Sequence, residues 1–169
     1  MTKQYFIDLA EFNVWANNIV CGWLEQISDE QWSQHVVSSF NSIQETSLHI
    51  ISAETAWLDR MNKAEVRWLQ KSFTGSREEH IALWNKTSNT LLDHVVALDE
   101  NKITQILNFK RLNGDPYSMP FYQVLAHMFN HSTFHRGQLV TMLRQVGFTD
   151  VSSTDLMGFY RIKNDLIKS

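Results

Sequence analysis

Proline interrupts this chain in one place. Its 169 residues include two prolines, Pro116 and Pro120, which stand close together in the last third of the sequence. Because proline lacks a backbone N–H and clashes with the preceding helical turn, it blocks long helices around this point and nowhere else. The sequence therefore permits helices before and after one short interruption, and the spacing of the apolar residues decides whether they form.

The apolar residues follow a helical period through most of the chain. In the first segment Phe6, Leu9, Phe12 and Ala16 recur with polar residues between them, as on an amphipathic helix. The predicted helices are about Lys3 to Leu24, one carrying Ile43 to Met61, one carrying Ile81 to Leu98, about Pro120 to Val146, and a shorter one from Thr154 to Ile167.

Three capping boxes mark predicted helix starts. In such a box a serine is followed three residues later by Glu or Gln, and the two side chains satisfy free N–H groups of the first turn. The boxes lie at residues 28–31, 42–45 and 76–79. The first predicts a short helix and the other two predict long ones. Gly147 suits the position just after the helix that ends near Val146.

The segment around the prolines predicts a small hairpin or an irregular excursion. Residues from Ile103 to Leu112 are partly β-branched, and Asn113-Gly114-Asp115-Pro116 is a strong turn signal. The predicted fold is therefore all-α. It is a four-helix bundle with a hairpin-like excursion before the last long helix and a short C-terminal helix, in a single domain over residues 1–169.

Composition narrows the functional classes. The net charge of −3 and pI near 6.1 argue against a nucleic-acid partner, which needs a concentrated basic face. No run approaches the roughly 18 apolar residues of a membrane span. Cys21 is the only cysteine, so no internal disulfide forms, and Asp8 and Glu11 occupy positions where a signal peptide would be apolar. A cytoplasmic protein is expected.

Three histidines, His127, His131 and His135, recur at a spacing of four within the last long helix. Residues four apart share one helix face, about 6 Å apart along the axis, so two imidazoles at this spacing can bind one metal ion. With about 100° per residue, His135 lies roughly 40° from the centre of the core stripe, His131 roughly 80° and His127 roughly 120°. The stripe is defined by Phe121, Leu125, Met128, Leu139, Leu143 and Val146. The favoured pair is His131 with His135.

A third ligand must come from another helix, and His49 is the best candidate because it lies in an apolar helical pattern. His35, His80 and His94 are expected to be less buried. Three nitrogens with an open position are typical of a catalytic zinc site, and Ni²⁺ or Fe²⁺ would accept the same ligands. The alternative is structural, since a buried imidazole can instead bond water or Gln138.

Other polar residues leave both structural and functional readings open. Asn13 and Asn17 could line a mouth of the bundle, with Trp15 between them packing in the core. Arg136 is expected to form a local salt bridge or to bind a ligand carboxylate. Glu45 is expected to cap its helix, and it is a weaker candidate ligand. Cys21 is expected to be a small buried hydrophobe.

Residues 130–138, Asn-His-Ser-Thr-Phe-His-Arg-Gly-Gln, resemble the His-x3-His-Arg-Gly-Gln signature of the DinB/YfiT-like family. Residues 42–58 resemble that family's second helix, with its first ligand histidine and a later Trp, and residues 13–17 resemble its first-helix pattern. The resemblance implies a four-helix bundle that binds a divalent metal, often Zn or Ni and possible also with Fe or Mn, through His49, His131 and His135. It also implies frequent homodimers, and relatives that include transferases and isomerases using small thiols such as bacillithiol or mycothiol.

Two functions are therefore expected alternatives. In the first, the protein is a metal-dependent enzyme that activates a small-thiol cosubstrate for S-transfer, or water for hydrolysis. No general base is evident in the sequence, which weakens the hydrolase version. In the second, the ion is structural or sensed, and the protein acts as a non-catalytic, stress-related dimer.

Overall fold

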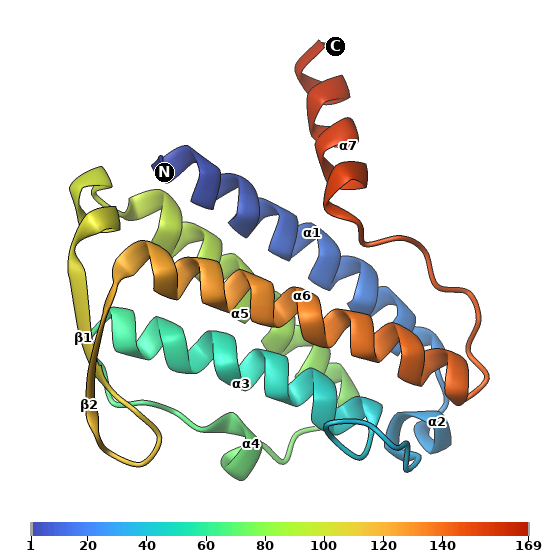
Figure 1. The fold of residues 1–169 in the computed structure, drawn as a ribbon. Helices are drawn as coiled ribbons and strands as arrows, with labels where there is room; N and C mark the ends of the chain where they lie inside the picture. The colour runs from blue at the N-terminus through green and yellow to red at the C-terminus, as the bar shows by residue number, and fades with distance from the viewer. Residues whose placement is uncertain (1, 169) are drawn as a thin grey trace.

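The computed structural model describes residues 2–168, with side chains described for residues 2–165. Four long helices lie alongside one another and form the predicted bundle, and a two-stranded sheet lies at one end of it (Figure 1). The long helices are α1 (Lys3–Gln26), α3 (Ile43–Met61), α5 (Arg77–Ala97) and α6 (Phe121–Gln145). The shorter elements are α2 (Asp29–Ser33), α4 (Leu69–Ser72), the 3-10 helix η1 (Glu100–Thr104), β1 (Ile106–Lys110), β2 (Pro116–Pro120) and α7 (Leu156–Lys168). The all-α prediction is confirmed.

The helix starts follow the predicted serines. Ser28 and Ser76 each form a complete capping box. Ser42 accepts a hydrogen bond from the Glu45 N–H, but the Glu45 carboxylate accepts from the N–H of Asn41 rather than from that of Ser42. The third box is therefore half-formed, and Glu45 stabilises the turn before the helix as well as its first turn.

The predicted hairpin is confirmed at the proline-containing segment. Strands β1 and β2 pair antiparallel, with Leu107 opposite Met119. Gly114 has a φ of +90° in the connecting turn, a conformation that favours glycine. Pro120 ends β2 and stands at the N-cap of α6, one residue earlier than the first-turn position expected for it. Because η1 and the hairpin lie between α5 and α6, they take the chain from the end of α5 to the start of α6.

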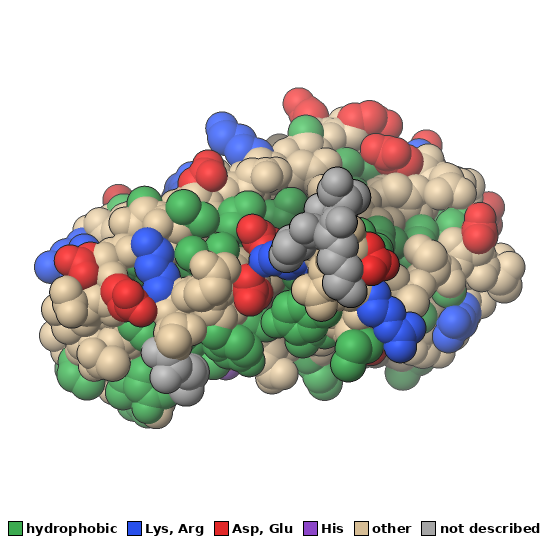
Figure 2. Space-filling model, turned by 90° about the horizontal axis from the view of Figure 1, so that it is seen from above, with side chains coloured by type: hydrophobic (Ala, Val, Ile, Leu, Met, Phe, Trp, Pro, Cys, Tyr) green, Lys and Arg blue, Asp and Glu red, His purple; other side chains and the backbone are tan. Residues whose placement is uncertain are grey.

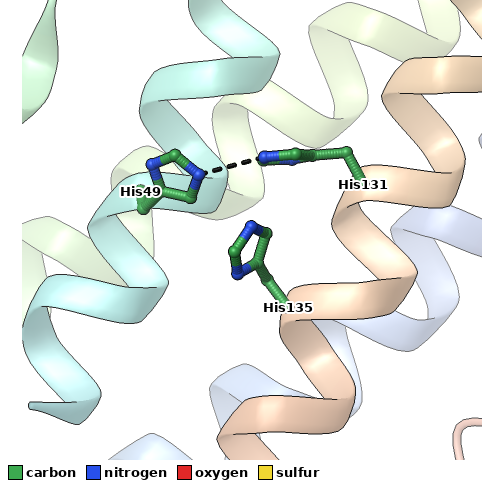
Figure 3. A group of neighbouring side chains, drawn as sticks. All are labelled: His49, His131 and His135. Carbon is green, nitrogen blue, oxygen red and sulfur yellow. Dashed lines mark hydrogen bonds between the residues drawn. The ribbon is translucent and has the colours of Figure 1, made fainter. Parts of the chain in front are cut away.

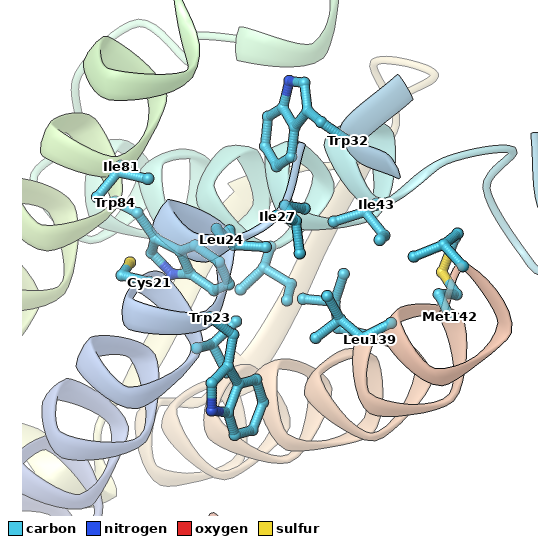
Figure 4. Close-up of a cluster of buried hydrophobic side chains, with 14 of the residues drawn as sticks. Cys21, Trp23, Leu24, Ile27, Trp32, Ile43, Ile81, Trp84, Leu139 and Met142 are labelled. Carbon is cyan, nitrogen blue, oxygen red and sulfur yellow. The ribbon is translucent and has the colours of Figure 1, made fainter. Parts of the chain in front are cut away.

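The bundle core has two apolar clusters separated along the helices by a polar layer. Figure 4 shows one cluster, which surrounds Trp84 and Leu24 near α2. The other cluster surrounds Phe6 and Leu125 near the hairpin. Full burial of side chains of this size contributes about 1.5–3 kcal/mol each. The polar layer consists of Asn13, Asn17, Glu54, Ser88, Ser132 and Arg136, all of them buried.

The short helix α7 projects from the bundle and contacts α1 (Figure 1). Phe159 packs on Phe12 and Trp15, with ring centroids 5.9 and 5.8 Å apart. Trp15 thus has a packing role, but it is half-buried against α7 and does not lie in the bundle core as expected. Lys163 donates hydrogen bonds to Asp8 and Glu11. Figure 2, which looks down on this face, shows hydrophobic side chains mixed with acidic and basic ones. Within the described part of the chain, no helix has the length and apolarity needed to cross a membrane.

The connection between α3 and α5 contains α4, which the apolar pattern did not predict. Asp59 near the end of α3 accepts hydrogen bonds from the backbone N–H and the guanidinium of Arg67 at 2.9 and 2.7 Å. These contacts hold the connection against α3. As a result Gln70, in α4, reaches a histidine of α3.

Candidate metal centre

The three predicted ligands, His49, His131 and His135, come together between α3 and α6 (Figure 3). Each offers one ring nitrogen, and these nitrogens lie within 4.8 Å of one another. The Nε2 atoms of His49 and His131 are 3.0 Å apart. The ring of His135 has its centroid 4.6 Å from that of His49 and 4.4 Å from that of His131. We call this group the histidine triad.

Helical geometry explains which histidines of α6 join the triad. His131 and His135 are one turn apart on the side of α6 that faces α3. His135 is buried with 6% of its surface exposed, His131 is half-buried, and His127 is exposed. The order of burial predicted from the helical period is confirmed, and His127 lies outside the group. Its ring centroid is 5.9 Å from that of His131.

Two glutamines hold the outer nitrogens of the triad. The Oε1 atom of Gln70 is 3.1 Å from Nδ1 of His49, and Oε1 of Gln138 is 2.7 Å from Nδ1 of His135. The amide nitrogen of Gln138 donates to Ser39 Oγ at 2.9 Å, which holds this side chain beside the ring. An amide oxygen can only accept, so each Nδ1 carries the proton and each Nε2 presents a lone pair to the triad.

The electrostatic setting keeps the triad uncharged. Burial, together with the neighbouring His135, His49 and His127, lowers the pKa of His131 to about 3. Burial also lowers the pKa of His49 and of His135, in each case against the opposing effect of the glutamine hydrogen bond. All three imidazoles are therefore neutral at pH 7. A neutral imidazole with a free lone pair is the form that binds metal ions.

The triad fits a divalent ion. An ion with nitrogens at about 2.0–2.1 Å in tetrahedral geometry separates those nitrogens by roughly 3.3 Å, close to the 3.0 Å between the Nε2 atoms of His49 and His131. Outer hydrogen bonds to ligating imidazoles are typical of metal sites. In the described residues, no Cys, Asp or Glu joins the three histidines as a further candidate ligand. The donor set is thus three neutral nitrogens.

Aromatic rings enclose part of the triad. The ring centroid of Phe40 lies 4.3 Å from that of His49 and 5.9 Å from that of His135. Phe134, on α6, lies 5.0 Å from His135. Phe40 and Gln70 were not predicted as site residues. Both belong to segments that connect the long helices, and no periodic pattern in the sequence indicates that these segments contact the triad.

The expectation that His80 is less buried was wrong. Its side chain is 1% exposed, and its Nε2 is 2.9 Å from Ser47 Oγ. Its ring lies edge-on to Trp32, with centroids 4.9 Å apart. Burial lowers the pKa of His80 to about 4. His35 is exposed and His94 is half-buried, and neither joins the triad.

Arg136 differs from both of its predicted roles. It is 2% exposed, and one Nη donates to Oδ1 of Asn13 at 2.6 Å and of Asn17 at 2.8 Å. The salt bridges of the described residues do not include it. The prediction that the two asparagines line a mouth was also wrong, since both are buried in the bundle interior.

Glu54 completes this polar layer and was not predicted from the sequence. Its Oε1 accepts hydrogen bonds from Asn13 at 2.8 Å and from Ser132 at 2.9 Å. Its side chain is fully buried, and burial raises its pKa despite those bonds and the nearby charge of Arg136. An acidic residue among apolar neighbours on α3 was the available signal. Its role as a hydrogen-bond acceptor becomes evident only from its partners, Asn13 on α1 and Ser132 on α6.

Comparisons with known proteins agree with this architecture. The sequence profile of the DinB family matches residues 1–163. The protein DinB of Bacillus subtilis strain 168 is 27% identical over 155 residues, which cover 86% of this chain and 88% of that protein.

Solved structures show the same fold. A DinB-like protein of Bacillus cereus ATCC 10987 superposes with a TM-score of 0.71 at 21% identity, covering 90% of this chain and 97% of the other. A DinB-like protein of Bacillus subtilis superposes with a TM-score of 0.67 at 16% identity, covering 87% and 96%.

Proposed function

The chain belongs to the DinB family, and on that premise we propose that it binds one divalent metal ion through His49, His131 and His135. The observation that carries this proposal is the pair of Nε2 atoms 3.0 Å apart in the triad. The glutamine bond at His49 Nδ1 leaves its Nε2 as a lone pair. A cation shared with His131 and His135 satisfies these lone pairs together.

The residues around the triad prepare it for such an ion. Gln70 and Gln138 keep protons on the outer nitrogens, which orients the rings and raises the basicity of the inner nitrogens. Phe40 packs against His49 and Phe134 against His135, which restricts the movement of these two rings. When bound, a divalent ion supplies a Lewis acid that lowers the pKa of a thiol or of water beside it.

Thiol S-transfer suits these residues better than hydrolysis does. Activation of water by a protein group needs a general base within hydrogen-bond reach. Of the described residues, no carboxylate belongs to the triad group, and Glu54 is turned to Asn13 and Ser132. A thiol starts from a pKa of about 8.5, so a bound divalent ion would deprotonate it fully without a separate base, whereas bound water would reach a pKa of only about 7. In the proposed reaction the thiol loses its proton to solvent and its sulfur attacks an electrophilic carbon. A C–S bond forms as the bond from that carbon to a leaving group breaks, and the leaving group departs with the electron pair.

Zn²⁺ and Ni²⁺ are the proposed ions, and Fe²⁺ or Mn²⁺ would be weaker occupants. Imidazole is a ligand of intermediate softness that favours the later divalent ions of the first row. Mn²⁺ prefers oxygen ligands, which the triad does not supply. The homodimer expected from the family stays a prediction, as does the thiol itself.

The second candidate is a non-catalytic site that stabilises or senses metal. It is favoured by the way the triad joins α3 to α6, because an ion there would cross-link two helices of the bundle. Binding energy would then appear as folding energy. The two candidates differ in whether the bound ion accepts a ligand from solution.

Metal content tests the site directly. Purified protein stripped with a chelator and dialysed against Zn²⁺ or Ni²⁺ should hold one ion per chain by elemental analysis. His131→Ala and His135→Ala should hold less than a tenth of that, since each loses one of three nitrogens. His127→Ala, the matched control on the same helix, should bind like the wild type. Undiminished stoichiometric metal in His135→Ala would overturn the assignment.

A spectral change on adding a thiol to the Co²⁺ form would favour the candidate function as an enzyme over the non-catalytic one.

A further inference from the structure

A row of exposed and half-buried side chains leads from the triad toward the hairpin. The ring centroid of His127 lies 5.9 Å from that of His131, and Trp57 lies 5.8 Å from His127. Phe109 of β1 lies 5.1 Å from Trp57. We call His127, Trp57, Phe109 and the adjoining Arg60 the outer strip. It joins α6, α3 and β1 on one continuous surface.

Arg60 at the far end of this strip is a cation stacked on rings. Its guanidinium carbon lies 4.7 Å from the ring centroid of Trp57, 5.3 Å from that of Trp68 and 5.6 Å from that of Phe109. Its Nε donates to the carbonyl of Lys110 at 3.4 Å. Stacking on aromatic faces fixes the plane of a guanidinium and leaves its edge available for hydrogen bonding.

That edge has no acidic partner in the part of the chain that is described. None of the salt bridges there includes Arg60, and its sequence neighbour Asp59 is paired with Arg67 at 2.7 Å. No hydrogen bond from either Nη of Arg60 is found among the same residues, and burial lowers its pKa. A partly desolvated cation with two free donor nitrogens gains most from a planar anion that accepts both bonds.

The separation between this cation and the triad sets the size of a ligand that reaches both. Trp57 is eight residues after His49 on α3, which places it about 12 Å further along the helix axis. Because the guanidinium of Arg60 lies over the ring of Trp57, it stands on the order of 10 Å from the triad.

We propose that the outer strip is a subsite for the tail of the metal's ligand, in which Arg60 binds a terminal carboxylate and Trp57 supports the chain between. The inference rests on the proposed metal site. It specifies a substrate class, namely a small molecule with a metal-binding thiol at one end and a carboxylate on the order of 10 Å away. In this role Arg60 determines specificity and does not touch the reacting atoms.

A ruler experiment tests the subsite with defined thiols. The Co²⁺-loaded protein is titrated with 8-mercaptooctanoate, whose extended chain spans on the order of 10 Å, with 8-mercaptooctanol, which lacks the charge, and with 3-mercaptopropionate, which is too short. Binding is read from the sulfur-to-cobalt charge-transfer absorption. The variants are Arg60→Gln and Arg60→Lys, and the control is Arg161→Gln, an equal charge change at an exposed position of α7. Cobalt content is measured first in every protein.

We expect Arg60→Gln to lose affinity for only one of the three thiols. Arg60→Gln should raise the dissociation constant of 8-mercaptooctanoate about tenfold, because a charge-assisted pair is removed. The constants for the alcohol and the short acid should change less than twofold, and Arg60→Lys should fall between. Equal weakening of all three thiols, or no change in any, with normal cobalt content would overturn the subsite alone. Failure of the wild type to take up cobalt would overturn the metal site and this inference with it.

Discussion

The bundle contains two polar clusters that differ in how their hydrogen-bonding groups are satisfied. In the polar layer, Arg136 donates to Asn13 and Asn17, and these asparagines donate in turn to Glu54. The layer contains both a cation and an acid, and it is closed by groups from all four long helices. In the histidine triad, burial lowers the pKa of all three rings, and the Nε2 atoms of His49 and His131 face each other at 3.0 Å.

This difference indicates a structural role for the polar layer and supports the proposed binding role of the triad. Buried polar groups stabilise a fold when they satisfy each other, and they cost free energy when they do not. The polar layer satisfies itself apart from Oε2 of Glu54, which has no partner in the described residues. The triad contains no acid or cation of its own, and the proposed divalent ion would contact all three rings at once. Loss of a residue should therefore affect folding in the first cluster and metal binding in the second.

The largest expected effect is the loss of Arg136. Arg136→Met should lower the free energy of unfolding by about 3–5 kcal/mol, because it leaves Asn13 and Asn17 without a donor and Glu54 without a nearby cation. Urea unfolding of the metal-free protein measures it. Arg144→Met, an exposed arginine near the end of the same helix, should change it by less than 1 kcal/mol. If the two variants are equally stable, the polar layer does not hold the bundle together.

The two clusters should also respond to pH with opposite signs. The pKa of His131 is lowered in the folded state to about 3, so its contribution is fully present above pH 6.5 and is lost as pH falls toward 3. For this part-exposed ring the loss is roughly 2 kcal/mol after allowing for solvent. The pKa of Glu54 is raised, so its contribution is present below about pH 4.5 and is lost as pH rises through the folded-state pKa.

Uncharged variants separate the contributions of these residues to the pH dependence of the unfolding free energy. His131→Gln should reduce the fall in stability of the metal-free protein between pH 6.5 and 4, and His80→Gln is needed beside it because the pKa of His80, about 4, acts in the same direction. Glu54→Gln should leave that fall intact and remove a decline at higher pH. Unfolding free energies measured by urea at intervals of pH provide the test. A Glu54→Gln profile parallel to the wild type throughout would contradict the opposite-sign expectation.

The sequence predicts the parts of both clusters that follow a single helix. The core stripe of α6 predicts the burial order of His135, His131 and His127, and the apolar pattern around His49 points to α3. The parts that depend on contact between distant segments were not predictable in this way. Gln70 reaches the triad from a four-residue helix, and His80 is covered by Trp32 from another element. Neither contact has a local pattern, so periodicity gives no information about it.

The smallest effect, and the sharpest test of the difference between the clusters, is at Gln138. This residue touches the triad only through His135, so Gln138→Ala should weaken metal affinity about tenfold, the lower end of the effect of losing an outer hydrogen bond. Unlike Arg136→Met, Gln138→Ala should change the stability of the metal-free protein little, because the Gln138 side chain is only partly buried.

Gln138→Glu keeps an oxygen that accepts from Nδ1 and should restore affinity, whereas Gln145→Ala, at an exposed position of the same helix, should have no effect. Competition with a chelating indicator measures the affinity. Wild-type affinity in Gln138→Ala would mean that the glutamine does not orient the ring, and the triad would then depend on packing by Phe40 and Phe134 instead.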